Sequence, residues 1–153
     1  MRLGLTASRA VGALKDLLRP TASRAKVTIT YEPSRDGDPD PGEVVWTWVA
    51  YEDDPSQGKD RPVVVIGRDG ERLVGVALTT QASSRDDVVE VGRGDWDAEG
   101  RVSYAKLDRI LPVEPSTMRR EGGVLDRRRF DRLVSALRRH HGIVVPTRRR
   151  PAR

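Results

Sequence analysis

An arginine stands directly before a proline at the start of a continuous apolar run. Arg61 is followed by Pro62 and then by Val63-Val64-Val65-Ile66, a pattern typical of a buried strand. A guanidinium held at the mouth of such a strand presents its planar fork of donors in a set direction, which suits a phosphate. Thr79 and Thr80 end the next predicted strand and add two hydroxyl groups. These residues predict phosphodiester chemistry on RNA, and the alternative is a small barrel that only binds a ligand.

The same residues also have simpler structural explanations. Arg61 could pair with Asp60 or Asp108 at the rim of a barrel and form an ordinary surface ion pair. Thr79 and Thr80 are residue types that strands favour without any catalytic role. The positions of these residues in the sequence are therefore compatible both with a catalytic role and with an ordinary structural role at the ends of strands.

The composition excludes several kinds of catalytic and metal site. The chain has no cysteine, which removes disulfides and thiolate metal sites, and its two histidines are adjacent, at His140 and His141. The strand-rich part therefore has no histidine for a two-histidine ribonuclease mechanism. Aspartates are abundant in the predicted loops but show no recognisable ligand spacing. We expect neither a metal nor a cofactor.

Strand and turn signals predict a mainly β fold, a small barrel closed by one C-terminal helix. Asp69-Gly70 predicts a tight type I′ turn, and residues 51–60 are expected to form a polar loop with a flexible glycine before Arg61. Asp126 is expected to cap the helix and Gly142 to end it. The predicted strands span residues 43–49, 62–67, 72–79 and 88–91, with one or two more within 102–113.

Two tryptophans alternate along the first of these strands. Trp46 and Trp48 share one face, while Val45, Thr47 and Val49 share the other. We expect one tryptophan in the core. The other is expected at a surface that meets a partner protein or stacks on a base.

Composition also divides the chain into three parts. Residues 1–41 form an N-terminal extension, with a short helix over 1–19, a strand over 27–31 and a linker rich in proline and aspartate. Residues 42–142 form the barrel and its helix, and residues 143–153 form a basic tail. The net charge of +5 comes from basic ends around an acidic middle, so charge alone is a weak sign of nucleic-acid binding. Because no run of about 18 apolar residues occurs, we expect a cytoplasmic protein.

Five short motifs occur in a set order before the predicted helix. Their order resembles that of the MazF/PemK toxins of bacterial type II toxin–antitoxin systems, over roughly residues 42–142. The chain departs from the family pattern at Ser56-Gln57-Gly58-Lys59, where the family commonly has Glu-Gln-Gly-Gly. The motifs are Gly42-Glu43-Val44, Gln57-Gly58-Lys59-Asp60-Arg61-Pro62, Val63-Val64-Val65-Ile66, Ala77-Leu78-Thr79-Thr80-Gln81 and Lys106-Leu107-Asp108-Arg109-Ile110.

The resemblance implies an SH3-like barrel of the CcdB/PemK type, usually a homodimer, held in check by a cognate antitoxin protein. Such toxins are metal-independent endoribonucleases of the mRNA interferase type. They cut single-stranded RNA at short sequences and leave 2′,3′-cyclic phosphate and 5′-hydroxyl ends. By their place in the family motifs, Arg61 and Thr79 would be catalytic. The residues expected to bind substrate are Gln57, Gly58, Lys59, Thr80, Gln81 and Arg109.

A second function is compatible with the same barrel. The related toxin CcdB has this barrel type but poisons a topoisomerase through protein contact, so the fold alone does not decide the activity. The alternatives are therefore a non-catalytic inhibitor of that kind and a decayed toxin.

Overall fold

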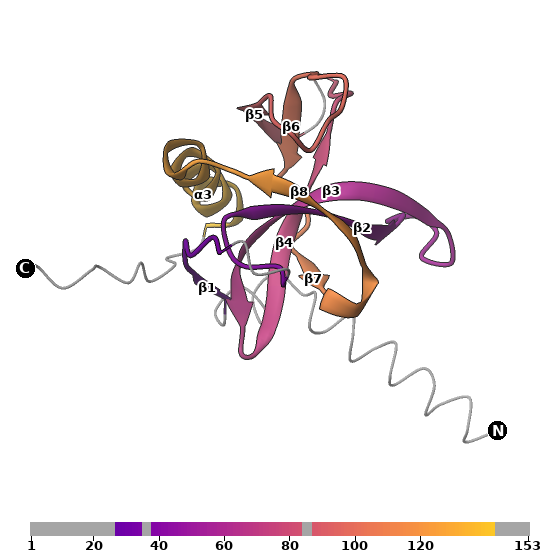
Figure 1. Cartoon of the computed structure of the whole chain (residues 1–153), viewed down its shortest axis with the longest axis horizontal. Coiled ribbons are helices and arrows are strands. Elements are labelled where there is room, and N and C mark those ends of the chain that lie inside the picture. Colours follow the sequence, from indigo (N-terminus) through magenta and orange to yellow (C-terminus); the bar gives the residue numbers. More distant parts are fainter. Residues whose placement is uncertain (1–26, 35–37, 84–86, 143–153) are drawn as a thin grey trace, which may run out of the picture.

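The structure is a computed structural model of the chain that describes residues 27–34, 38–83 and 87–142. The helix expected over 1–19 and the basic tail over 143–153 lie outside these residues. Strands dominate the described part, and one long helix follows them (Figure 1). The elements are β1 (Val27–Ile29), β2 (Glu43–Ala50), β3 (Gly58–Asp69), β4 (Arg72–Thr79), β5 (Val88–Gly92), β6 (Ser103–Lys106), β7 (Leu111–Val113), a 3-10 turn (Pro115–Thr117), β8 (Met118–Val124) and α3 (Arg127–His141).

The two central strands, β3 and β4, change neighbours along their lengths. The sheet runs in the order β5-β6-β4-β3-β2-β8, with β1 added to β3 and β7 added to β4. β3 pairs with β2 between Gly58 and Val64 and with β1 between Gly67 and Asp69. β4 likewise pairs with β7 near its start and with β6 at its end. This exchange of partners curls the antiparallel sheet into the small barrel expected from the strand pattern.

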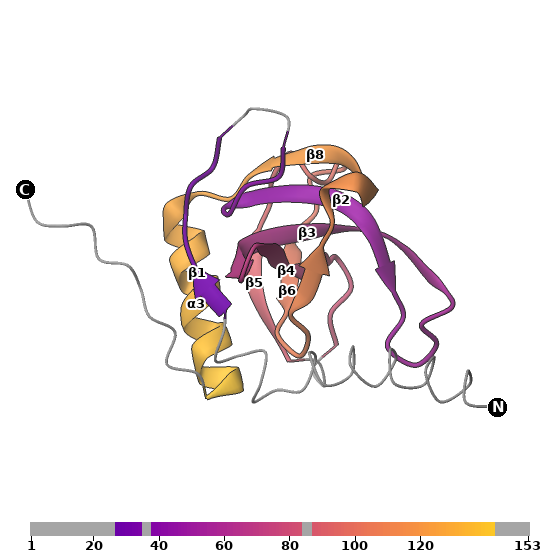
Figure 2. The same cartoon turned by 90° about the horizontal axis from the view of Figure 1, so that it is seen from below.

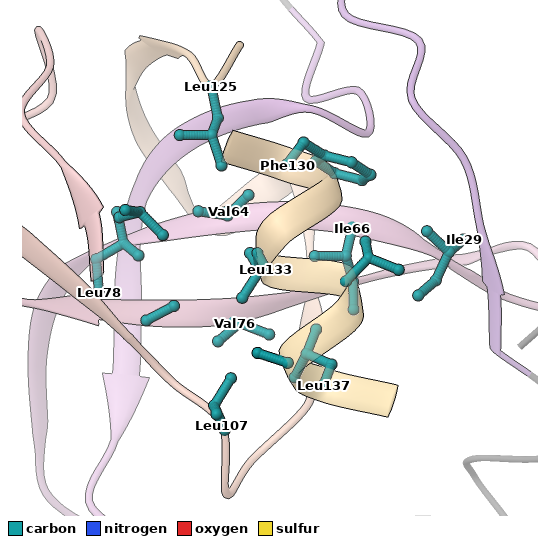
Figure 3. Close-up of a cluster of buried hydrophobic side chains, with 14 of the residues drawn as sticks. Ile29, Val64, Ile66, Val76, Leu78, Leu107, Leu125, Phe130, Leu133 and Leu137 are labelled. Carbon is teal, nitrogen blue, oxygen red and sulfur yellow. The ribbon is translucent and has the colours of Figure 1, made fainter. Parts of the chain in front are cut away.

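The central strands bury both of their faces, which explains why Val63-Val64-Val65-Ile66 is continuously apolar. Val64 and Ile66 belong to the cluster that packs under α3, together with Phe130, Leu133 and Leu137 (Figure 3). Val63 and Val65 point to the other side and pack with Val45, Ala77 and Leu111. A strand with helix on one face and barrel interior on the other needs no polar positions.

The ends of α3 agree with the predicted helix signals. The carboxylate of Asp126 accepts a hydrogen bond from the Arg129 N–H at 3.0 Å, and thereby caps the first turn. Gly142 adopts a left-handed conformation with φ of 65° and ends the helix. His141 also contacts the sheet, because its Nε2 lies 2.6 Å from the carbonyl oxygen of Leu107.

Two local expectations are wrong, and one strand was missed. The β3–β4 turn has a positive φ only at Gly70, the first of its two residues, which is the pattern of a type II′ turn rather than type I′. β3 begins at Gly58, so the glycine before Arg61 belongs to a paired strand and not to a flexible loop. β8 was not predicted, because Met118-Arg-Arg-Glu-Gly-Gly-Val has little apolar pattern and is held in place by pairing with β2.

The described part of the N-terminal extension packs on the barrel and the helix. β1 adds to the edge of β3 and lies beside α3 (Figure 2). Tyr31 donates a hydrogen bond from its hydroxyl to the Leu125 carbonyl at 2.8 Å, and its ring meets the Phe130 ring edge-on at 5.0 Å. The buried Glu43 carboxylate accepts the Ser34 N–H at 2.6 Å and so ties the linker to β2. Val27 and Ile29 belong to the core cluster and Tyr31 packs against it, so this segment is attached to the barrel.

Candidate functional site

A cavity opens where β3 and β4 separate. Their ladder ends at the pair Val63 and Ala77. Beyond it β3 continues beside β2, while the end of β4 pairs with β6 through Leu78 and Thr79. The hollow between the separated strands has a volume of about 410 Å³. Its lining residues are Trp46, Lys59, Asp60, Arg61, Pro62, Leu78, Thr79, Thr80, Gln81, Asp97, Arg101, Ser103 and Lys106.

Arg61 is the arginine that β3 contributes to the lining of this cavity. Among the described residues, its side chain has neither a hydrogen-bond partner nor an ion-pair partner. The neighbouring Asp60 instead lies 3.7 Å from the Arg119 Nε. The simpler interpretation, in which Arg61 pairs with Asp60 or Asp108, is therefore not what the structure has. A half-buried guanidinium that keeps all its donors is suited to binding an anion.

Thr79 also lines the cavity, from the end of β4, and it organises the chain that follows it. Its Oγ1 accepts the Gln81 N–H at 3.1 Å and donates to the Gln81 carbonyl at 3.1 Å. This small turn fixes the hydroxyl oxygen relative to the end of β4. The hydroxyl proton can rotate from the carbonyl toward a ligand, while the Gln81 N–H continues to hold the oxygen.

The cavity carries more positive than negative charge. Lys59, Arg61, Arg101 and Lys106 contribute four cations, and Asp60 and Asp97 contribute two anions. Lys59 and Lys106, like Arg61, have no ion-pair partner among the described residues. Within an otherwise acidic middle segment, this hollow is a local site for an anion.

One ion pair on the cavity wall is unusually well formed. Arg101 donates from Nε and Nη2 to the two carboxylate oxygens of Asp97, at 3.0 and 2.9 Å. The hydrogen bond from Arg101 is the main cause that lowers the pKa of Asp97 to about 2. The same contact raises the pKa of Arg101. Both groups therefore stay charged and paired at neutral pH.

Five of the eight site residues expected from the sequence line this cavity, and three do not. Lys59, Thr80 and Gln81 join Arg61 and Thr79 there. Arg109 donates to the Ala50 carbonyl at 3.0 Å and lines a separate hollow of about 60 Å³, which Arg61 also borders. Gln57 closes the β2–β3 turn through its backbone, and Gly58 lies in β3.

Gly58 has a packing reason for being glycine. A Cβ placed there would lie 2.7 Å from the Trp48 ring, which covers the strand at that point. Gly58 therefore shapes the β2–β3 hairpin rather than a flexible loop over the cavity.

The expectation that Trp46 or Trp48 enters the core is wrong. Their face of β2 is covered at Val44, but it opens farther along the strand, so that Trp46 borders the cavity and Trp48 is 44% exposed. The core tryptophan is Trp96, which is 2% exposed. Trp96 follows two glycines in an acid-rich loop without alternation, so no sequence pattern predicted its burial.

Other cavity residues were also missed from the sequence. Asp97 and Arg101 come from the loop before β6, Ser103 begins that strand and Lys106 ends it. An aspartate followed four residues later by an arginine was the available signal, but that spacing usually marks a surface helix pair. Among the described residues there is no group of three metal-ligating side chains, and none of their helices is long and apolar enough to cross a membrane.

The fold and the cavity together define a small β-barrel protein with a cationic hollow where its sheet divides. The chain belongs to the PemK-like, MazF-like toxins of type II toxin–antitoxin systems, because the model of that family matches residues 40–141. The family indicated by the sequence motifs is therefore confirmed. No curated protein sequence matches the chain.

Solved structures support the same fold. An endoribonuclease in complex with its cognate antitoxin, from a mycobacterial species, aligns with a TM-score of 0.54 at 18% identity, covering 71% of this chain and 99% of that chain. MazF (Form-I) from Deinococcus radiodurans aligns with a TM-score of 0.53 at 17% identity, covering 69% and 98% respectively. At such identities the likeness establishes the fold, and the predicted mainly β barrel with a C-terminal helix is confirmed.

Proposed function

We propose that this protein is an endoribonuclease toxin that cuts single-stranded RNA in the cavity between β3 and β4. The observation that carries the proposal is the Arg61 guanidinium, which has no partner among the described residues and lines the same cavity as Thr79. Family membership supports the assignment, as does the similarity to structures named as endoribonucleases.

The proposed reaction uses a nucleophile that RNA itself supplies, so no metal is needed to generate one. The 2′-hydroxyl oxygen loses its proton and attacks the adjacent phosphorus, while the bond from phosphorus to the 5′-oxygen breaks. The departing 5′-oxygen takes up a proton. The products are a 2′,3′-cyclic phosphate and a 5′-hydroxyl.

Arg61 would stabilise the extra negative charge on the five-coordinate phosphorus. Its guanidinium is always charged and can hold two phosphate oxygens at once. Removing one such donor typically costs about a hundredfold to a thousandfold in rate. Thr79 would position the phosphate by donating a hydrogen bond from its hydroxyl to a phosphate oxygen. Positioning suits it better than acid–base catalysis, because a free hydroxyl is a poor acid and base near neutral pH.

Substrate binding would extend over neighbouring residues of the same hollow. Lys59 and Lys106 would attract the flanking phosphates, and Thr80 and Gln81 would contact the nucleotide next to Thr79. Arg109, in the smaller hollow beside Arg61, would act by holding the β2–β3 turn through the Ala50 carbonyl. Bases would enter as single strands, because an A-form duplex hides its base edges.

The proposal includes a cognate antitoxin, a homodimeric toxin and a cytoplasmic location. Related structures are named as complexes of an endoribonuclease with its cognate antitoxin and of MazE with MazF. A protein that cleaves cellular RNA and is silenced by a partner would meet both in the cytoplasm.

The test is cleavage of a mixed-sequence RNA in EDTA, followed by determination of the end groups. Wild type should yield cyclic phosphate and 5′-hydroxyl ends, and Arg61→Ala should lose them. Arg68→Ala is the matched control, because Arg68 is also a half-buried arginine of β3 without a partner among the described residues, but lines a different hollow. Equal cutting by Arg61→Ala would refute the assignment and favour a CcdB-like inhibitor or a decayed toxin.

A further inference from the structure

The loop between β5 and β6 is a rigid wall of the cavity. Its Trp96 is buried and donates from Nε1 to the Ser103 hydroxyl at 3.0 Å. The Trp96 carbonyl accepts the indole N–H of Trp46 at 2.9 Å, which fixes the orientation of the Trp46 ring at the cavity. Helix α3 holds the other end of the loop, because Arg129 donates from Nη1 to the Arg93 carbonyl at 2.6 Å.

Within this wall, Arg101 is held in one orientation. Its backbone N–H donates to the Asp97 carboxylate at 2.7 Å, and its guanidinium makes the two further bonds to the same carboxylate described above. The Gly100 N–H bonds the Asp97 carbonyl at 2.9 Å and closes the turn. The Asp97 side chain is only 9% exposed, whereas that of Arg101 is 53% exposed. One side of the guanidinium is thus anchored and the other is open.

The anchored guanidinium keeps three of its five N–H donors. Asp97 takes the Nε–H and one hydrogen of Nη2, which leaves both hydrogens of Nη1 and the second of Nη2. The outer hydrogens of Nη1 and Nη2 point in parallel and match two adjacent acceptors on a ligand. A fixed fork of this kind loses little conformational freedom on binding.

The charges around Arg101 favour a neutral ligand over a phosphate. Asp97 neutralises the guanidinium, and the Glu99 carboxylate lies 3.3 Å from its Nε. A phosphate brought to this point would meet one cation and two anions. Lys59, Arg61 and Lys106 are better placed for phosphates, since no carboxylate among the described residues pairs with them.

We propose that Arg101, fixed by Asp97, reads a guanine base that stacks on Trp46 at the wall of the cavity. The inference rests on the proposed function and names a base preference for the same site. Guanine presents O6 and N7 side by side as acceptors, which an arginine fork bonds in a bidentate manner. Adenine presents an acceptor beside a donor on the same edge, and would leave one arginine N–H facing an amino group.

The test measures binding of short, fluorescein-labelled 2′-O-methyl oligouridines by fluorescence polarisation. The methyl group blocks the nucleophile, so binding is read without cleavage. One central base is guanine, 7-deazaguanine, adenine or cytosine. Wild type should bind the guanine probe about tenfold more tightly than the 7-deazaguanine and adenine probes, because each lacks one of the two paired acceptors.

Two variants separate recognition from general structure. Arg101→Lys keeps the charge but removes the fork, and should reduce the preference for guanine over 7-deazaguanine to less than about twofold. Asp97→Asn frees the guanidinium and should weaken the preference. Asp131→Asn is the matched control, since Asp131 pairs with Arg127 at the same four-residue spacing on the outside of α3. It should bind all four probes as wild type does.

Each result decides the proposal. Equal binding of guanine and 7-deazaguanine by wild type, tightest binding of the cytosine probe, or no binding of any probe would overturn it. The comparison of probes uses wild type, so poor folding of a variant does not remove the test. If wild type cleaves RNA but does not prefer guanine, the proposed function is supported and the guanine preference is refuted. If wild type prefers guanine but does not cleave RNA, the result contradicts the proposed nuclease activity and not the base preference.

Discussion

Arg61 and Thr79 occupy positions that would face each other directly if the β3–β4 ladder continued two residues beyond the pair Val63 and Ala77. Instead the two strands separate, and both residues line one cavity, Arg61 from β3 and Thr79 from β4. The separation begins at Pro62, which has no N–H to donate to a neighbouring strand. Both side chains are therefore carried by regular strands whose inner ends are fixed in the core, which is the kind of support that a precise site requires.

The contribution of Thr79 to cleavage should come from its hydroxyl group and not from its methyl group. Thr79→Val removes the phosphate contact and leaves the Gln81 N–H without its acceptor, so we expect RNA cleavage to slow by about tenfold to a hundredfold. Thr79→Ser keeps the hydroxyl and should lose much less. Single-turnover cleavage rates check this, and equal rates for the serine and valine variants would contradict a role for the hydroxyl.

The Asp97–Arg101 pair should make stability depend on pH in the acid range. Because the folded protein holds the pKa of Asp97 at about 2, below its ordinary value of 3.8, the unfolded chain binds the proton first. The contribution is present above about pH 4 and is lost as the pH falls toward 2. Asp97→Asn should flatten this part of the profile.

Urea unfolding at a series of pH values between about 2 and 5 measures the effect. Because Arg101 is half-exposed, salt should screen the ion pair. The difference in pH-dependent stability between wild type and Asp97→Asn should therefore shrink at high ionic strength. Identical slopes for both proteins at low salt would show that the pair does not form in solution.

Tyr31 should couple the N-terminal extension to the stability of the barrel. Tyr31→Phe removes the hydrogen bond to the Leu125 carbonyl and should lower the free energy of unfolding by about 1 kcal/mol. Burial is the main cause that raises the pKa of Tyr31, and Asp126 adds to it. The unfolded chain therefore ionises first, and this part of the stability should fall as the pH rises past about 10.

Denaturant unfolding of wild type and Tyr31→Phe at neutral and alkaline pH tests that coupling. Unchanged stability of the phenylalanine variant would mean that residues 27–34 do not unfold together with the barrel.

Much of the strand framework was readable from the sequence because its signals are local. The apolar run after Pro62 needs burial on both faces, and Asp126 and Gly142 mark the ends of α3 in the usual way. Arg61, Thr79 and Thr80 were singled out by residue type and position, and the family resemblance then indicated Arg61 and Thr79 as the catalytic pair. The residues alone left open an ordinary ion pair for Arg61. Whether the two residues act in catalysis remains a prediction.

The features that were missed depend on tertiary contacts. β8 is polar and contains two glycines, and it becomes a strand because it pairs with β2, with extra residues accommodated at Gly122 and Arg119. Trp96 lies in a loop, and its burial depends on hydrogen bonds with Ser103 and Trp46, which lie outside that loop. Arg101 joins the cavity for the same reason, since the loop that carries it is anchored by contacts far apart in the chain.

The most direct test of the central claim is a double-mutant cycle on Arg61 and Thr79, read as the single-turnover rate of RNA cleavage in EDTA. If both residues act on the same phosphate, Arg61→Ala alone should cost about a hundredfold or more, and adding Thr79→Val should cost little further. Losses that simply multiply would mean that the two residues act independently. Wild-type rates for the single variants would contradict the assignment of the site.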